Sequence, residues 1–143
     1  MTDEMVSVRY MVDDVDEAID FYTERFGFEL GQNASPAFAE VLRGRLRLLL
    51  AGPKSSAARP MPDGRKPEPG GWNRIHFVVD DIAAEVDRLR PAGVRFRNDI
   101  ISGPGGKQVL LEDPSGNPIE LFQPAESTAR GDPARDRTAQ RPK

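Results

Sequence analysis

The feature that most constrains this chain of 143 residues is an internal repeat. The segment Val12–Val15 recurs as Val79–Ile82, and Ala18–Asp20 recurs as Glu85–Asp87, both at an offset of 67 residues. Self-similarity at a fixed spacing is the signature of a duplicated structural unit. Because two copies of this length fill most of the chain, we expect a fold built from one unit used twice.

Each copy opens with a short run in which apolar residues alternate with mixed ones. A period of two with β-branched and aromatic residues predicts a strand that packs one face and turns the other toward a wetter environment. The two runs are in phase with each other. Their apolar sets are Val6, Val8, Tyr10 and Val12 in the first copy and Ile75, Phe77 and Val79 in the second.

A helix is predicted after each of these strands. Asp14 and Asp81 are good N-caps, and Glu17 completes a capping-box pattern with Asp14. Gly27 and Gly93 suit the positive φ at which helices commonly end, and Pro91 should end the second helix a residue or two early. The apolar stripes are Val15, Ala18, Ile19, Tyr22 and Phe26 in the first helix and Ile82, Val86 and Leu89 in the second.

Three more strands complete each predicted unit, which gives an α+β fold of two βαβββ modules with helices outside a curled mixed sheet. Turn-forming residues at 113–117 join the last two strands. We expect one domain over residues 1–124, with modules at 6–52 and 72–124, a proline-rich connector at 53–71 and a disordered tail at 125–143. The predicted strands are Glu29–Gln32, Phe38–Arg43, Leu46–Ala51, Arg95–Asn98, Gln108–Glu112 and Ile119–Gln123.

Composition excludes several function classes. The chain has no cysteine, so it can form neither a disulfide nor a thiolate zinc site. The formal charge is −3 and basic residues do not cluster, which argues against nucleic acid as a partner. No apolar run is long enough to cross a membrane, and the acidic first residues do not resemble a signal peptide. We therefore expect a cytoplasmic protein.

Two motifs resemble those of the vicinal oxygen chelate superfamily, which contains glyoxalases, bleomycin resistance proteins and dioxygenases. Residues 14–22 followed by Phe26-Gly27-Phe28 are similar to the opening pattern D-x-x-x-A-x-x-F-Y…[LF]-G-F. Residues 113–121 are similar to the closing pattern D-P-x-G-N-x-x-E-[LF]. The resemblance covers about Val6 to Pro124 and implies two βαβββ modules that form a cup. It also suggests a homodimer.

The resemblance implies four metal-ligand positions, on the first and last strand of each copy. They fall on Ser7, on Leu48 or Leu49, on Arg74 and on Glu120. Only Glu120 can bind a divalent metal, and Arg74 would repel one. His76, the single histidine, lies two residues from the expected position, so Glu120 and His76 are the only metal candidates. We expect no cofactor; a divalent metal held by these two residues is the alternative.

Because the first strands are in phase, their mixed faces should line the cup together with the last strand of the second copy. An arginine there could neutralise Glu120, since an unpaired buried charge is very costly, or could bind an anion on a ligand through its fork of donors. His76 is either structural or an acid–base group. The predicted ligand-binding residues are Ser7, Arg9, Met11, Arg74, His76, Glu120 and Phe122.

These residues support two hypotheses of different class. In the first, the protein binds a small aromatic or anionic organic molecule without a catalytic metal, as bleomycin-resistance-like proteins do. In the second, it is a metal-dependent lyase, isomerase or dioxygenase of glyoxalase type that uses Glu120 and His76. Metal-free acid–base catalysis by the same two residues is a weaker third. The sequence leaves open whether the protein is an enzyme.

Overall fold

The computed structural model describes residues 4–125, which form two compact units. The first unit comprises residues 4–73 and 112–118, and the second comprises residues 74–111 and 119–125. The predicted disordered tail lies outside the described residues from position 126 onward. No described helix is long and apolar enough to span a membrane.

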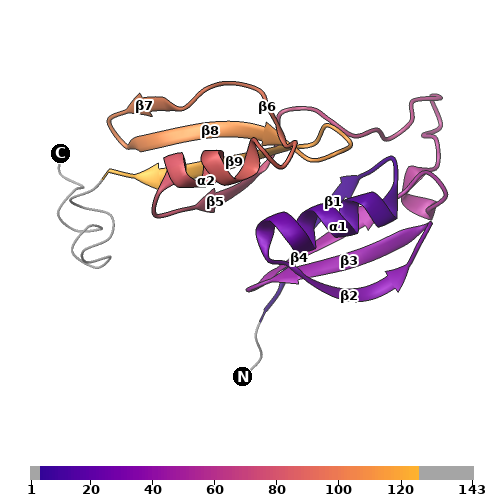
Figure 1. Cartoon of the computed structure of the whole chain (residues 1–143). Helices are drawn as coiled ribbons and strands as arrows, with labels where there is room; N and C mark the ends of the chain where they lie inside the picture. Colours follow the sequence, from indigo (N-terminus) through magenta and orange to yellow (C-terminus); the bar gives the residue numbers. More distant parts are fainter. Residues whose placement is uncertain (1–3, 126–143) are drawn as a thin grey trace. The chain divides into compact units, whose positions relative to one another are not determined.

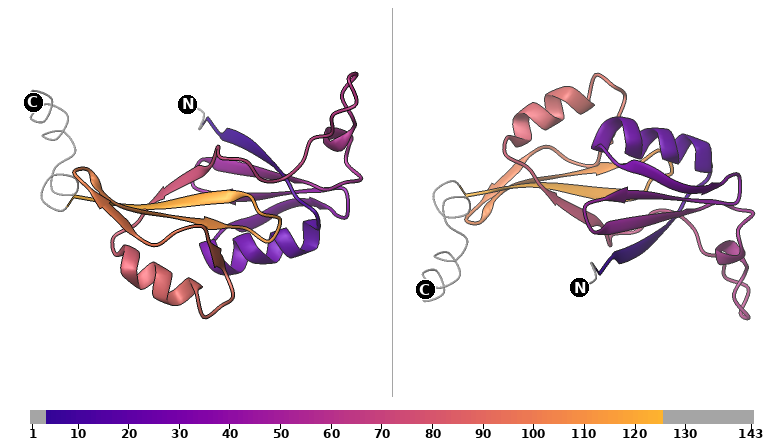
Figure 2. Two further views of the ribbon diagram at one scale, coloured as in Figure 1. Left: turned by 90° about the horizontal axis from the view of Figure 1, so that it is seen from above. Right: turned by 90° about the horizontal axis from the view of Figure 1, so that it is seen from below.

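The first unit contains one four-stranded mixed sheet with strand order β1-β4-β3-β2 (Figure 1). The first strand runs parallel to β4, and β4 and β2 run antiparallel to β3. The helix α1 covers one face of this sheet (Figure 2). The elements are β1 (Val6–Met11), α1 (Val15–Phe26), β2 (Glu29–Ala34), β3 (Phe38–Arg43) and β4 (Leu46–Ala51).

The helix α1 begins and ends where the sequence predicts. The Asp14 side chain accepts a hydrogen bond from the Glu17 backbone N–H, which satisfies one of the free donors of the first turn. Gly27 follows the helix with a φ of 70°, which only glycine adopts without strain. The predicted apolar stripe packs on the sheet and is buried along its whole length: Val15, Ala18, Ile19, Tyr22 and Phe26.

The second unit repeats this plan in a five-stranded sheet with the path β5-β9-β8-β6, in which β7 pairs with β8. The first strand again runs parallel to the last. The helix α2 lies on one face of the sheet (Figure 2). The elements are β5 (Ile75–Val78), α2 (Ile82–Leu89), β6 (Arg95–Phe96), β7 (Ile101–Gly103), β8 (Gly106–Glu112) and β9 (Pro118–Pro124).

The helix α2 is shorter than α1. The Asp81 side chain caps its start by accepting a hydrogen bond from the Ala84 backbone N–H, as predicted. It ends at Leu89, two residues before Pro91, whose ring fixes φ and lacks an N–H. Its inward residues are buried with the apolar residues of β8 and β9: Ile82, Val86, Leu89, Val109, Leu111, Ile119 and Leu121.

Several local features differ from the prediction, including the bounds of β2, β8 and β9, which extend one or two residues beyond those predicted. The strand β6 ends at Phe96 rather than at Asn98, because the Asn98 side chain accepts the hydrogen bond of the Leu110 N–H in place of a backbone carbonyl. The hairpin strand β7 was not predicted, although the glycines on either side of Pro104 are typical of a tight turn. The proline-rich connector contains one 3-10 turn at Ser56–Ala58.

The turn at residues 112–118, which we call the Asp113 turn, joins β8 to β9 but packs within the first unit. Asp113 is 1% exposed and accepts a hydrogen bond of 2.8 Å from the Tyr22 hydroxyl. It also accepts hydrogen bonds from the backbone N–H groups of Ser115 and Asn117. The Asn117 amide donates to the Met11 carbonyl at 2.8 Å. The second copy of the repeat therefore contributes a buried polar network to the first unit.

The predicted fold class is confirmed: two βαβββ modules with mixed sheets, each with a helix on one face. The sheets are curled but not closed. Among the described strands, β1 and β2 are the edges of the first sheet, and β5 is an edge of the second. The single-domain boundary at residue 124 stays a prediction.

Candidate functional site

The parallel pairing of β5 with β9 places His76 directly opposite Glu120, and Val78 opposite Phe122. Side chains on a strand alternate between its two faces, so His76, Glu120 and Phe122 lie on one face of the second sheet. Ile119 and Leu121 point to the opposite face and are buried there. The second unit therefore carries its polar residues on the face that its core does not use.

An ion pair joins Arg74 to Glu120. Both Nε and Nη2 of Arg74 lie 3.0 Å from Oε1 of Glu120. The Glu120 side chain is only 10% exposed and that of Arg74 is 28% exposed. A carboxylate this buried needs a partner, and the guanidinium supplies charge and two donors to one oxygen. Of the two roles considered for an arginine here, neutralisation of Glu120 is the one that this contact performs.

His76 contacts the other oxygen of the same carboxylate. Its Nε2 lies 3.6 Å from Oε2 of Glu120, and its side chain is 45% exposed. On the other side its ring lies 5.2 Å from the Phe122 ring, with 33° between the ring planes. The imidazole thus bridges a buried carboxylate and an aromatic ring while part of it faces solvent. Such a ring can stack on a planar molecule or exchange a proton with it.

The equivalent face of the first sheet carries a different polar group. The Ser7 hydroxyl accepts a hydrogen bond of 2.9 Å from Nε of Arg47 on β4. Arg47 also lies 3.9 Å from Glu40 on β3, whose Oε2 accepts a hydrogen bond from the Gln32 N–H. The sequence reasoning missed Arg47 and Glu40. The signal was present, because each is the single charged residue on an otherwise apolar strand face.

The strand register decides which β4 residue corresponds to Glu120. Arg9 and His76 are equivalent positions of the repeat, 67 residues apart. His76 pairs with Glu120, and Arg9 pairs with Leu49. Leu49, rather than Leu48, is therefore the first-unit counterpart of Glu120. Leu48 points to the other face of the sheet and is fully buried.

The residues at the four implied metal positions do not fit a divalent metal. Ser7 is engaged by Arg47, Leu49 has no donor atom, and Arg74 places its positive charge on the carboxylate that a metal would need. Among residues 4–125 there is no group of three or more His, Cys, Asp or Glu side chains placed to hold a metal. A tightly held metal ion normally has at least three protein ligands, and Glu120 with His76 offers two.

A sequence model of the Glyoxalase/Bleomycin resistance protein/Dioxygenase superfamily matches residues 4–121. The chain belongs to this superfamily. The match includes the first module, the connector, the second module as far as Leu121, and every residue of the predicted site except Phe122, which lies one position beyond it.

Proteins similar to this superfamily member are described with different functions. It is 33% identical over 106 residues to "Putative glyoxylase CFP32" of Mycobacterium tuberculosis, which covers 72% of this chain and 39% of that protein. The chain thus spans well under half the length of this relative. Among solved structures, a superfamily member from Sphaerobacter thermophilus is 28% identical with a TM-score of 0.68, covering 86% of this chain and 98% of that one.

A second solved structure is TnmS3, an antibiotic binding protein from Streptomyces sp. CB03234. It is 27% identical to this chain with a TM-score of 0.64, and the match covers 87% of this chain and 98% of that one.

The predicted site residues form two sets. The structure brings together Arg74, His76, Glu120 and Phe122 in the second unit, and Ser7, Arg9 and Met11 share one face of β1 in the first. That the two sets line one pocket stays a prediction.

Proposed function

We propose that this superfamily member binds a small aromatic or anionic organic molecule and does so without a catalytic metal. The observation that carries the proposal is the contact of Arg74 with Glu120. Glu120 is the one carboxylate at the implied metal positions, and it is already paired with the Arg74 guanidinium. The similarity to TnmS3, an antibiotic binding protein, supports a binding function for this chain.

The proposed binding surface combines an aromatic ring pair with charged groups. His76 and Phe122 present neighbouring rings on which a planar molecule can stack. Arg74 has a planar guanidinium that suits a carboxylate or phenolate. We propose that Ser7, Arg9 and Met11 complete the site. A site of this kind is mostly apolar, with a few polar groups that orient the ligand.

The alternative is a metal-dependent lyase, isomerase or dioxygenase of glyoxalase type that uses Glu120 and His76. One observation favours it: Nε2 of His76 lies 3.6 Å from Oε2 of Glu120, so a nitrogen and a carboxylate oxygen already converge. The description of CFP32 as a glyoxylase also supports the enzyme alternative. In this case the protein is an enzyme and its two candidate catalytic residues are His76 and Glu120.

Elemental analysis of the purified protein tests the metal. We expect less than stoichiometric nickel, zinc, manganese or iron, because two ligands beside a guanidinium hold such ions weakly. Glu120→Gln serves as the matched variant, since it keeps the side-chain shape while removing the charge. About one metal ion per chain, lost in Glu120→Gln, would contradict the metal-free proposal and favour the enzyme.

A ligand screen followed by product analysis separates binding from catalysis. The screen measures thermal shifts with aromatic carboxylates, glycopeptide antibiotics and short 2-oxo compounds, and mass spectrometry follows each hit. A ligand that binds only the folded state raises the melting temperature as its concentration increases. We expect such shifts with the ligand recovered unchanged. Conversion of a hit that His76→Asn abolishes would overturn this expectation.

We also propose that the protein forms a homodimer and works in the cytoplasm. The fold alone does not specify the dimer interface. Light scattering coupled to size-exclusion chromatography measures the assembly directly. A molecular mass of about 16 kDa, that of a single chain of 15.8 kDa, would contradict the dimer.

A further inference from the structure

The first unit contains a pocket that none of the assignments above explains. It has a volume of about 710 Å3, within the range of small-molecule sites. Its walls come from the end of β1 and from the connector at residues 53–71, which reaches outward and turns back (Figure 2). Of the seven residues of the proposed site, only Met11 lines this pocket. We call it the connector pocket.

The connector is held at both ends by hydrogen bonds to other parts of the first unit. At its start the Gly52 N–H donates to the Ala37 carbonyl at 2.9 Å, and a Cβ on Gly52 would lie 2.7 Å from the Pro36 carbonyl oxygen. At its end the Gly70 N–H donates to Oδ1 of Asn117 at 2.8 Å, and Asn117 is 4% exposed. At the tip the Met61 N–H donates to the Arg65 carbonyl at 2.7 Å, which joins the outgoing and returning limbs.

Proline makes the pocket walls stiff. Four of the five connector prolines line the pocket: Pro53, Pro60, Pro67 and Pro69. Each has a fixed φ, so the wall has little backbone freedom to lose when a ligand binds. A pocket that is already in its bound shape gains affinity because this ordering cost is small. The prolines together with Met11, Val12 and Ala58 also give it an apolar surface.

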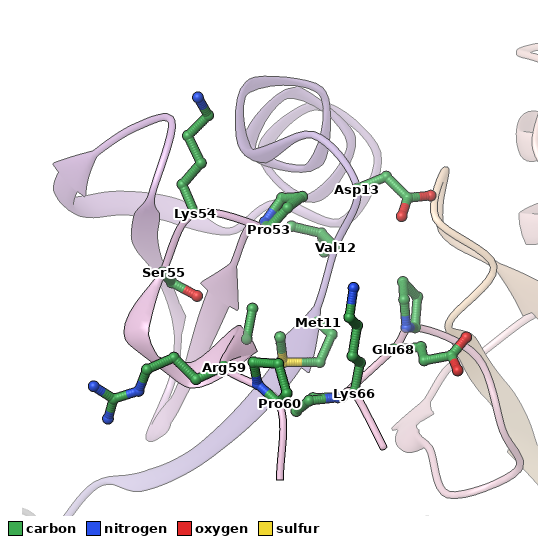
Figure 3. A pocket seen from close by; sticks show the side chains of 13 residues that line it. Met11, Val12, Asp13, Pro53, Lys54, Ser55, Arg59, Pro60, Lys66 and Glu68 are labelled. Carbon is green, nitrogen blue, oxygen red and sulfur yellow. The ribbon is translucent and has the colours of Figure 1, made fainter. Parts of the chain in front are cut away.

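Charges of both signs line the same pocket. The ammonium group of Lys66 points between the walls, and the carboxylates of Asp13 and Glu68 lie at separate places on the side away from Lys54 and Arg59 (Figure 3). Lys54 and Arg59 also line the pocket, and their charged ends extend outward from it. Within residues 4–125 neither Lys66 nor the two carboxylates form an ion pair of 4.0 Å or less, and all three residues are exposed, so each charge is accessible to a ligand. A ligand with both charges would satisfy both sides at once.

We propose that the connector pocket binds a small zwitterion with a flat apolar body, of which an aromatic amino acid is the simplest example. Its carboxylate binds Lys66 and its ammonium binds Glu68, on the side of the pocket that Asp13 also lines. Its ring packs on the proline wall, where burial of apolar surface adds to the binding. This site shares only Met11 with the site proposed above, and the charged residues that test it belong to the connector pocket alone.

Isothermal titration of the full chain with three probes tests the assignment. Phenylalanine carries both charges, phenylacetate only the negative one and phenethylamine only the positive one, while all three share one ring. We expect phenylalanine to bind about tenfold more tightly than either analogue, the effect of one charge-assisted hydrogen bond. Equal affinities for all three, or no saturable binding of phenylalanine in the millimolar range, would overturn the proposal.

Matched variants locate the site. Lys66→Met and Glu68→Gln should each weaken phenylalanine binding about tenfold, because each removes one charged partner of the ligand. Lys107→Met and Glu24→Gln change exposed charges outside the pocket and should leave the affinity unchanged. Thermal melting of each variant checks that it folds. Unchanged binding in Lys66→Met, or an equal loss in the controls, would contradict the proposed site.

Discussion

In the first unit Arg9 on β1 pairs with Leu49 on β4, whereas in the second unit His76 on β5 pairs with Glu120 on β9. The pairing is parallel in both and occurs at the same position of the repeat. In the first unit it carries an arginine and a leucine, and in the second it carries a histidine on a buried carboxylate. The duplicated backbone is therefore independent of the chemistry placed on it.

The two units also differ in how their cores are closed. The first unit includes the Asp113 turn, although that turn belongs to the second copy of the repeat. Tyr22 of α1, which is fully buried, needs a partner for its hydroxyl and finds it in Asp113. The Asp113 carboxylate accepts three further hydrogen bonds, one from the Ser115 N–H and two from Asn117. The motif that resembles the superfamily pattern thus has a structural role that can be tested.

The largest effect is expected for Asp113→Ala. The change leaves the Tyr22 hydroxyl and the Asn117 amide without the acceptor that now lies at 2.8 and 3.0 Å. Loss of a buried hydrogen-bond network typically costs about 3–5 kcal/mol, and we expect about 4 kcal/mol. Urea unfolding monitored by circular dichroism measures the loss. Asp99→Ala is the control, because the Asp99 side chain is 98% exposed and should change the stability by under about 0.5 kcal/mol.

If Asp113→Ala were as stable as the parent, the buried network would not contribute to the stability of the first unit. Fluorescence of the single tryptophan, Trp72, provides a second signal from that unit. Coincident unfolding by circular dichroism and by fluorescence would justify a two-state treatment.

The repeat, both helices and the βαβββ order of elements along each copy could be predicted from sequence because local signals determine them. Asp14, Gly27 and Asp81 act within one turn of chain, and the apolar stripe of α1 requires only the helical period. The bounds of β3 and β4 agree with the prediction for the same reason. The strand β7 was missed because its three exposed residues show no apolar alternation.

The candidate site was predictable only in part. Arg74, His76 and Glu120 could be placed on one face because strand alternation and the repeat fix their phase. Their distances could not be predicted, since the β5–β9 register pairs strands far apart in sequence, such as His76 with Glu120. The same holds for Glu40 and Arg47, which only the pairing of β3 with β4 brings together.

A smaller effect on stability is expected when Arg74 of the second unit and Arg9 of the first are each replaced by methionine. Arg74→Met leaves the Glu120 carboxylate, 10% exposed, without its cation. A fully buried broken pair costs about 3–5 kcal/mol; because Arg74 is 28% exposed, we expect about 2 kcal/mol in urea unfolding without ligand. Arg9→Met on β1 is the matched change in the first unit and should cost under about 0.5 kcal/mol.

Adding Glu120→Gln to Arg74→Met should recover part of the stability, because a neutral amide is less costly to bury than an unpaired carboxylate. If Arg74→Met were as stable as the parent, solvent or His76 would be sufficient to stabilise the Glu120 carboxylate. In that case Arg74 would be available for a ligand anion, and the same variant should weaken the binding of an anionic screening hit.

The smallest effect concerns the pH dependence that Tyr22 gives to the first unit. Burial, followed by the charge and hydrogen bond of Asp113, raises the pKa of Tyr22 well above its ordinary value of 10. The folded state therefore keeps the phenol proton at a pH where the unfolded chain releases it. The stabilising contribution of this proton is fully present below pH 10 and is lost as pH rises through the raised pKa.

The free energy of unfolding of the parent should fall by up to about 1.4 kcal/mol per pH unit relative to Tyr22→Phe, which has no such proton. Urea unfolding of both proteins between about pH 9 and pH 11 measures the difference, and Tyr10, present in both, cancels. A difference that does not change over this range would mean that the Tyr22 hydroxyl titrates equally in both states, which would contradict its burial against Asp113.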